Sequence, residues 1–160
     1  MSTHSDPLWS RSVSLYASTA SVRARHLAAA LGGGVNGEYV VLCCHGDDDR
    51  ILIPELAEEM ERFQPFHGSV GPDEIRNITA LTASVVVITG CGTGTDTLAA
   101  AFLDSGASAY LAPVGAPFGY ASIFAPLFVF YELTEGRTLH QAVDRLSRHD
   151  PELAMWRLWP

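Results

Sequence analysis

The chain contains no lysine, and its ten basic residues are all arginines scattered between Arg11 and Arg157. The missing lysine excludes Schiff-base catalysis and a phosphate-binding loop that depends on a lysine. Against these ten arginines stand 18 acidic residues, which give a formal net charge of −8. Such a surface would repel a nucleic-acid backbone, so DNA and RNA are not expected as partners.

Cysteines are also few. Cys43, Cys44 and Cys91 are odd in number, and their spacing suits neither a disulfide framework nor a paired zinc knuckle. The apolar runs are too short to span a bilayer, and residues 1–10 lack the basic start and apolar stretch of a secretory signal. We therefore expect a soluble, cytoplasmic protein with no membrane partner.

The length and composition predict one folded domain. The chain has 160 residues, 48% of them hydrophobic, which is enough to bury a sizeable core. We place the core at about residues 12–148, with terminal segments at 1–11 and 149–160. The sequence contains no internal repeat and no low-complexity segment.

Short β-branched runs alternate along the chain with helical patterns. This alternation, with connections long enough for crossovers, predicts a three-layer α/β/α sandwich with a mainly parallel sheet. We expect the second of the helices to begin at Pro54, the fourth to be capped by Asp96, and the fifth to be interrupted near Pro126. The expected strands are 12–17, 39–44, 83–89 and 107–112, and the expected helices are 22–31, 54–63, 73–78, 98–104, 120–133 and 138–148, with a loop at 64–72.

Two of these strands end at reactive side chains. The run Val40–Leu42 leads through two cysteines to His45-Gly46, and the run Val85–Ile88 leads through Thr89-Gly90 to Cys91. His45 and Cys91 are 46 positions apart. Because the carboxyl ends of parallel strands meet at one edge of a sheet, this pattern predicts an imidazole beside a thiol.

Such a pair has the chemistry of a nucleophile and its base. Cys91 opens a glycine-rich turn before a helix, where a thiolate is favoured, and Gly90 would let a substrate backbone approach closely. His45 is the candidate base, and the N–H groups of Gly46 and Cys91 are candidates for an oxyanion hole. Taken singly, a cysteine or a histidine at a strand end is more often structural, so the hypothesis depends on their pairing.

Other interpretations of the same residues stay open. Cys44, His45 and Cys91 are possible zinc ligands, although a fourth ligand is missing. The acidic turn at 47–49 is typical of a solvated loop, yet Asp47 and its neighbours could also bind a basic substrate side chain or calcium. The turn Gly90–Thr95 is similar to nucleotide-binding loops but fails their glycine spacing.

At these two strand ends the chain resembles the caspase-related cysteine peptidases, the superfamily of caspases, metacaspases and bacterial CHAT-type domains. The similarity continues in Leu98–Ala107, which matches the CHAT-type pattern Ala-x-x-Phe-Leu-x-x-Gly-Ala, and in Phe128–Gly136 with the helix that follows. It covers about residues 38–147. The resemblance implies a shortened caspase-like fold.

The resemblance also implies roles for individual residues. Cys91 would attack a peptide carbonyl, His45 would transfer the proton, and the N–H groups of Gly46 and Cys91 would bind the oxyanion. Such enzymes need no metal and no organic cofactor, and their partner is a protein or peptide substrate. Thr89 matches a substrate-reading position that relatives often fill with an acidic or amide residue.

Two departures from the family pattern bear on function. Thr89 leaves the substrate preference open, and the short link between the first two predicted strands reduces the sheet to about four strands. An exposed sheet edge would favour a second copy or a partner chain. The segment 155–159 either docks on a partner or packs back on its own domain.

Two alternatives to a peptidase stay open. One is a catalytically inactive interaction domain of the same fold, and the other is a nucleotide-binding doubly wound domain.

Overall fold

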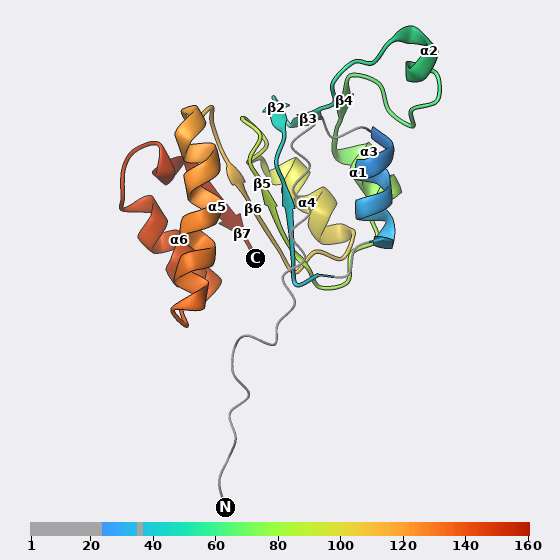
Figure 1. Cartoon of the computed structure of the whole chain (residues 1–160). Helices are drawn as coiled ribbons and strands as arrows, with labels where there is room; N and C mark the ends of the chain where they lie inside the picture. The colour runs from blue at the N-terminus through green and yellow to red at the C-terminus, as the bar shows by residue number, and fades with distance from the viewer. Residues whose placement is uncertain (1–23, 35–36) are drawn as a thin grey trace, which may run out of the picture.

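The computed structural model describes residues 24–34 and 37–160 (Figure 1). The predicted strand at 12–17 and the first two residues of the predicted helix 22–31 lie outside the described residues. Of that helix the structure has α1 (Ala24–Ala29), followed by the wider turn η2 (Ala30–Gly34). Gly33 in this turn has a φ of 88°, a backbone conformation that favours glycine and ends the helix.

The central sheet has four strands in the order β1-β5-β6-β7. β1 (Tyr39–Leu42), β5 (Val85–Ile88) and β6 (Ala109–Pro113) are parallel, while β7 (Trp156–Trp159) runs antiparallel to β6. The chain is therefore a mixed α/β protein with a mostly parallel sheet, as the alternation of strand and helix patterns predicts.

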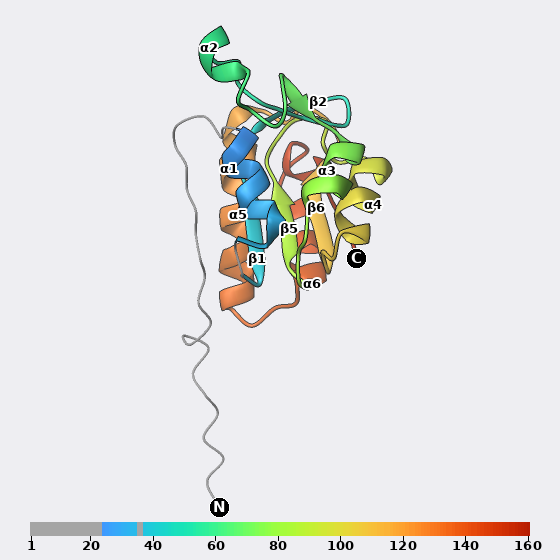
Figure 2. The same cartoon turned by 90° about the vertical axis from the view of Figure 1, so that its right-hand side faces the viewer.

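Helices cover both faces of this sheet (Figures 1 and 2). α1, α3 (Pro72–Ile78) and α4 (Asp96–Asp104) lie on one face, where Val40, Val86 and Ile88 join the larger core cluster. α5 (Gly119–Thr134) and α6 (Leu139–Ser147) lie on the other face and pack around Val87 and Leu111. Because successive side chains of a strand point to opposite faces of the sheet, the strands contribute to two separate cores.

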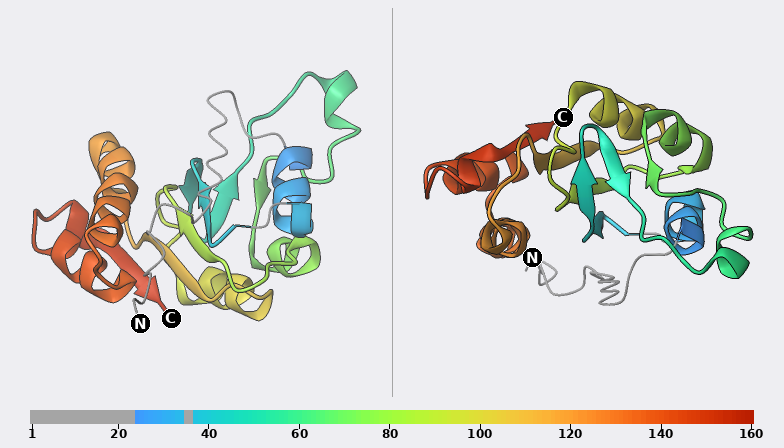
Figure 3. Two further views of the ribbon diagram at one scale, coloured as in Figure 1. Left: turned by 60° about the horizontal axis from the view of Figure 1, so that its bottom comes forward. Right: turned by 90° about the horizontal axis from the view of Figure 1, so that it is seen from above.

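A small antiparallel sheet follows β1 and was not predicted. It consists of β2 (His45–Asp47), β3 (Arg50–Leu52) and β4 (Ser69–Val70). The expected strand 39–44 is accordingly shorter, and the expected loop 64–72 contains β4. Seen from above, the β2–β3 hairpin lies over the carboxyl edge of the central sheet (Figure 3).

The helix expected at 54–63 is wrong in extent. Only α2 (Glu58–Glu61) is helical, and none of its residues is buried. This segment projects from the body of the molecule (Figures 1 and 2). Short helices need an apolar face packed against a core, and α2 has none, so the helix does not extend back to Pro54.

Two further helix predictions need correction. α5 is continuous through Pro126, because buried Ala125 and Val129 hold the helix against the sheet on either side of the missing N–H. The cap of α4 is Thr95 rather than Asp96: the Thr95 hydroxyl accepts a hydrogen bond from the Leu98 N–H. The predicted helices at 73–78 and 138–148 are confirmed as α3 and α6.

The C-terminal segment packs back on its own domain. A short 3₁₀ turn, η3 (Leu153–Met155), leads into β7, which completes the sheet beside β6. The Trp159 indole N–H donates to the Asp96 carboxylate at 2.8 Å, and its ring lies 5.6 Å from that of Tyr110. Of the two roles considered for residues 155–159, the structure shows the internal one. In the described part of the chain, no helix has the length and apolarity to cross a bilayer.

Candidate active site

The register of β1 and β5 ends the two strands at the same level of the sheet, three residues before each predicted catalytic residue. Every residue of β1 pairs with the residue 46 positions later in β5, from Tyr39 with Val85 to Leu42 with Ile88. His45 and Cys91 are separated by the same 46 positions. The chain therefore leaves the sheet at neighbouring points, with His45 as the first residue of β2 and Cys91 in the turn after β5.

Beyond the strand ends, the two segments touch through their backbones. A Cβ atom added to Gly90 would meet the Gly46 nitrogen at 3.0 Å and the His45 carbonyl at 3.1 Å. A Cβ atom on Gly46 would meet the Cys91 carbonyl oxygen at 2.5 Å. The two glycines thus allow a contact between the His45-Gly46 and Gly90-Cys91 backbones that no larger residue would permit.

The β2–β3 hairpin fixes the position of His45. Its two-residue turn, Asp48 and Asp49, has φ values of 39° and 72°, as in the tight hairpin turns that need two residues in the left-handed region. The Asp49 carboxylate accepts hydrogen bonds from the hydroxyls of Thr95 and Thr97 at the start of α4. The Asp49 N–H also donates to the Gly92 carbonyl at 3.2 Å. These contacts attach the His45 hairpin to the turn that carries Cys91.

The Cys91 turn is also attached to the end of β6 and to the segment that follows it. The N–H groups of Gly92 and Gly94 donate to the carbonyls of Gly115 and Pro113, both at 2.8 Å. The buried hydroxyl of Tyr110, a residue of β6, donates to the Thr93 carbonyl at 2.7 Å. The turn is therefore held on several sides, which is the rigid support that a nucleophile needs.

The two predicted catalytic side chains lie at the surface of this rim. His45 is exposed and Cys91 is half-buried, so both are open to a molecule that approaches the carboxyl edge. Within the described residues, the Cys91 N–H donates to no protein acceptor. That amide, one of the two predicted oxyanion donors, is available to a ligand.

Thr89 and Cys44 join the ends of the two strands. Thr89 is buried, and its hydroxyl accepts a hydrogen bond from the Cys44 N–H at 3.2 Å and contacts the Leu42 carbonyl at 3.5 Å. The hydroxyl therefore has a structural task, and the predicted contact of Thr89 with a substrate stays a prediction. Gly90 is likewise buried, while the predicted substrate residue Asp47 is exposed on β2.

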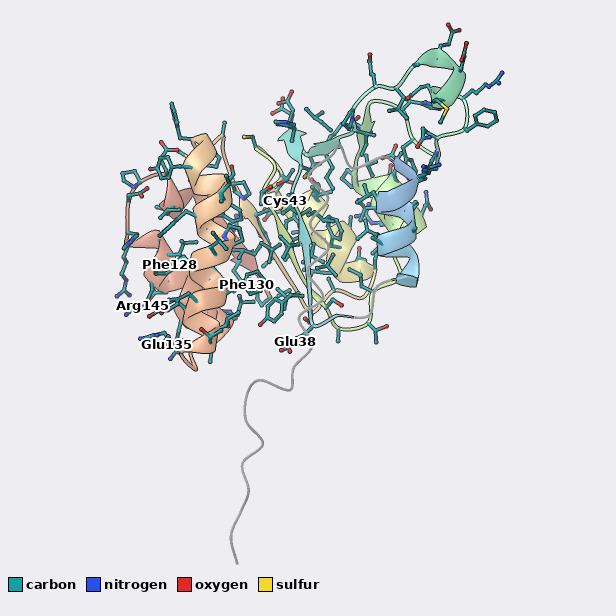
Figure 4. The ribbon with its side chains drawn as sticks, in the orientation of Figure 1. Glu38, Cys43, Phe128, Phe130, Glu135 and Arg145 are labelled. Atoms are coloured by element: carbon teal, nitrogen blue, oxygen red, sulfur yellow. The ribbon has the colours of Figure 1, made fainter. Side chains whose placement is uncertain are left out.

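The three cysteines have different surroundings at this edge. Cys43 is exposed near the upper end of β1 (Figure 4), whereas Cys44 is half-buried against the larger core. Burial raises the pKa of the Cys44 thiol to about 12, and the neighbouring thiols of Cys43 and Cys91 add to the shift. Cys44 is therefore a neutral thiol at physiological pH and is unsuited to act as the nucleophile.

The raised pKa of Cys44 predicts a loss of stability at high pH. The folded state holds the Cys44 proton more tightly than the unfolded chain does. The stability that depends on this proton is therefore fully present below pH 9 and is lost as the pH rises toward 12. We expect the free energy of unfolding to fall by a few kcal/mol over this window, measured by urea denaturation, and Cys44→Ala to fall less steeply. Burial also raises the pKa of Tyr110, so Tyr110→Phe should remove a separate part of the slope. Identical slopes in wild type and Cys44→Ala would contradict the assignment.

Sequence reasoning missed the supporting roles of three residues. Asp49 joins the hairpin to α4, Thr89 joins the two strand ends, and Tyr110 supports the turn from β6. The sequence drew attention to Asp49, as part of the acidic turn, and to Thr89, as a candidate substrate residue, whereas nothing in it singled out Tyr110. No group of three or more His, Cys, Asp or Glu side chains in the described part of the chain is arranged to hold a metal ion.

Comparisons with protein families and with curated proteins identify no relative of this chain. No protein-family model matches the chain, and no curated protein matches it significantly. The functional argument therefore depends on the residues and geometry of the site.

Proposed function

We propose that this protein is a cysteine peptidase with a shortened caspase-like fold, in which Cys91 is the nucleophile and His45 the general base. The observation that carries the proposal is the backbone contact between the His45-Gly46 and Gly90-Cys91 segments. These segments follow β1 and β5, which are neighbouring parallel strands of the central sheet. The predicted partner is a protein or peptide, and the proposed chemistry uses only side chains and backbone amides.

In the proposed reaction, His45 takes the proton of the Cys91 thiol, and the sulfur attacks the carbonyl carbon of a peptide bond. The imidazolium then gives its proton to the leaving amine as the carbon–nitrogen bond breaks, which leaves a thioester on Cys91. A water molecule, deprotonated by His45, hydrolyses the thioester and releases the acid. The exposure of His45 and Cys91 suits an extended substrate lying across the rim.

The oxyanion of the tetrahedral intermediate needs donors that are not already engaged. The Cys91 N–H meets this condition among the described residues. The Gly46 nitrogen lies beside the same turn, since a Cβ atom added to Gly90 would meet it at 3.0 Å, and we propose its N–H as the second donor. Removing one such donor costs on the order of 100-fold in rate in enzymes of this kind.

The geometry is less favourable to a nucleotide. Phosphate-binding loops present several free backbone N–H groups to the ligand. In the turn after β5, the N–H groups of Gly92 and Gly94 already donate to the Gly115 and Pro113 carbonyls. We therefore expect added nucleotides to leave the melting temperature unchanged.

The proposal is tested by screening a fluorogenic peptide library and by mapping the thiol that iodoacetamide modifies. We expect hydrolysis of some library members, and we expect modification of Cys91 to abolish that hydrolysis. Cys43→Ala is the matched control, because Cys43 is an exposed thiol two positions from His45 whose removal should leave turnover intact. No hydrolysis of any library member by a folded protein would favour the inactive interaction domain instead.

A further inference from the structure

One side of α5 is apolar and uncovered. Five large side chains on this helix are between 40% and 69% exposed, and together they form what we call the α5 stripe: Tyr120, Ile123, Phe124, Leu127 and Tyr131. The opposite side of the helix packs on the sheet through Ala121, Ala125 and Val129. A helix that is apolar all round is usually buried all round, so the stripe indicates an interface.

The spacing within the stripe is that of a helix–helix seam. Tyr120, Phe124, Leu127 and Tyr131 follow one another at intervals of four, three and four residues, which is the heptad spacing of coiled coils. The same four residues fit a second copy of the helix in antiparallel orientation. Tyr120 then faces Tyr131 of the second copy, and Phe124 faces Leu127. The stripe is therefore self-complementary, as an interface across a two-fold axis must be.

The exposed area is sufficient for such an interface. Side chains of about 150 to 250 Å² at these exposures leave roughly 600 Å² of surface on the stripe. A typical specific interface buries about 800 Å² on each partner, including a polar rim. The stripe supplies most of that area, and it is as large as the largest apolar patches on ordinary monomers.

Charge and rigidity also favour a second copy. Residues 119–131 contain no charged side chain, so two copies with a net charge of −8 each would meet there with the least repulsion.

The stripe is also held in place by its neighbours. The centroid of the Phe124 ring lies 5.8 Å from that of Phe128 and 5.9 Å from that of His149. Glu132 anchors the helix by ion pairs to Arg137 and Arg145 at 3.0 and 2.7 Å. Figure 4 shows Phe128 and Arg145 in this helical layer. A preformed surface loses little conformational entropy on binding.

We propose that the protein forms a two-fold symmetric dimer through the α5 stripe, with the two α5 helices antiparallel. The stripe contains none of the residues of the proposed catalytic site, and the proposal stands whether or not the protein is a peptidase. The dimer covers five of the ten large hydrophobic side chains that are exposed in the described part of the chain.

The test is the molar mass of the full chain in solution, measured by light scattering at concentrations up to about 100 µM. We expect a mass of twice 17.2 kDa for the wild type and of one chain for Leu127→Glu. Phe63→Glu is the matched control, because Phe63 is also a large exposed side chain but lies beyond α2, and it should remain dimeric. Circular dichroism checks that each variant is folded.

A second measurement tests the orientation. Phe124→Arg should also be monomeric, and a mixture of Phe124→Arg with Leu127→Glu should return to the dimer mass, because the new charges face each other in the antiparallel pair. A monomeric wild type would overturn the proposal, and so would a dimer unaffected by Leu127→Glu. In the first case the stripe would be covered by residues 1–23 or by a different protein. Failure of the mixture to associate would overturn the antiparallel arrangement.

Discussion

Replacing Cys91 by alanine is expected to reduce kcat/KM for peptide hydrolysis by about 1,000-fold or more, with the fold unchanged. The sulfur is the atom that forms the thioester in the proposed mechanism, and no neighbouring thiol can replace it. Cys44 is held neutral by its raised pKa of about 12, and Cys43 is an exposed residue that follows β1. The measurement is a progress curve on the best substrate from the peptide library.

Two companion variants make this result specific. His45→Ala should lose activity by about 100-fold or more, because the thiol then has no base beside it. Cys43→Ala should keep nearly all activity. If Cys91→Ala hydrolyses the same peptides at the wild-type rate, the turnover comes from elsewhere and the proposed mechanism is wrong.

Gly46→Ala is expected to separate the two halves of the site. The added methyl group would lie 2.5 Å from both the Cys91 carbonyl oxygen and the Thr93 Cγ2, well inside normal contact distance. One segment must therefore shift. A displacement of about 1 Å at a reacting group costs on the order of 100-fold in rate, and overpacking of this kind costs roughly 1–3 kcal/mol of stability.

The control for this variant is Gly119→Ala. Gly119 is the first residue of α5, and an added Cβ atom there meets nothing within 4 Å. This change should leave both activity and the urea midpoint within error of the wild type. A Gly46→Ala protein with normal stability and normal turnover would show that the His45 and Cys91 segments are not in the contact described.

The sequence predicts the main frame of the fold because that frame depends on long apolar patterns. The β-branched runs Val40–Leu42 and Val85–Ile88 form β1 and β5, and the helix patterns at 73–78, 98–104 and 138–148 form α3, α4 and α6. The predicted pairing of His45 with Cys91 is based on the same runs, since both strands end three residues before the reactive side chain.

The small antiparallel sheet could not be predicted in this way. β2, β3 and β4 have two or three residues each, too few to show an alternating pattern. The turn between β2 and β3 is Asp48-Asp49 instead of the Asn-Gly or Asp-Gly pairs that mark a hairpin in sequence. Contacts such as that of Tyr110 with Thr93 join residues far apart along the chain and depend on tertiary packing.

The exposure of α5 shows a further limit. The composition of residues 120–133 predicts an apolar helix, and that part is confirmed. Which side of the helix stays uncovered depends on how many neighbours the fold supplies, and α6 and the sheet leave the stripe open. Periodicity cannot identify that side in a helix with apolar residues all round.

The most direct test of the account is the distance between the imidazole of His45 and the sulfur of Cys91 in a crystal structure of the wild-type protein. The account predicts that a ring nitrogen lies on the same side of the sheet as the sulfur, at about 3 to 4 Å or joined to it by one water molecule. A structure with the two groups on opposite sides of the sheet, and with no room for either to reach the other, would contradict it.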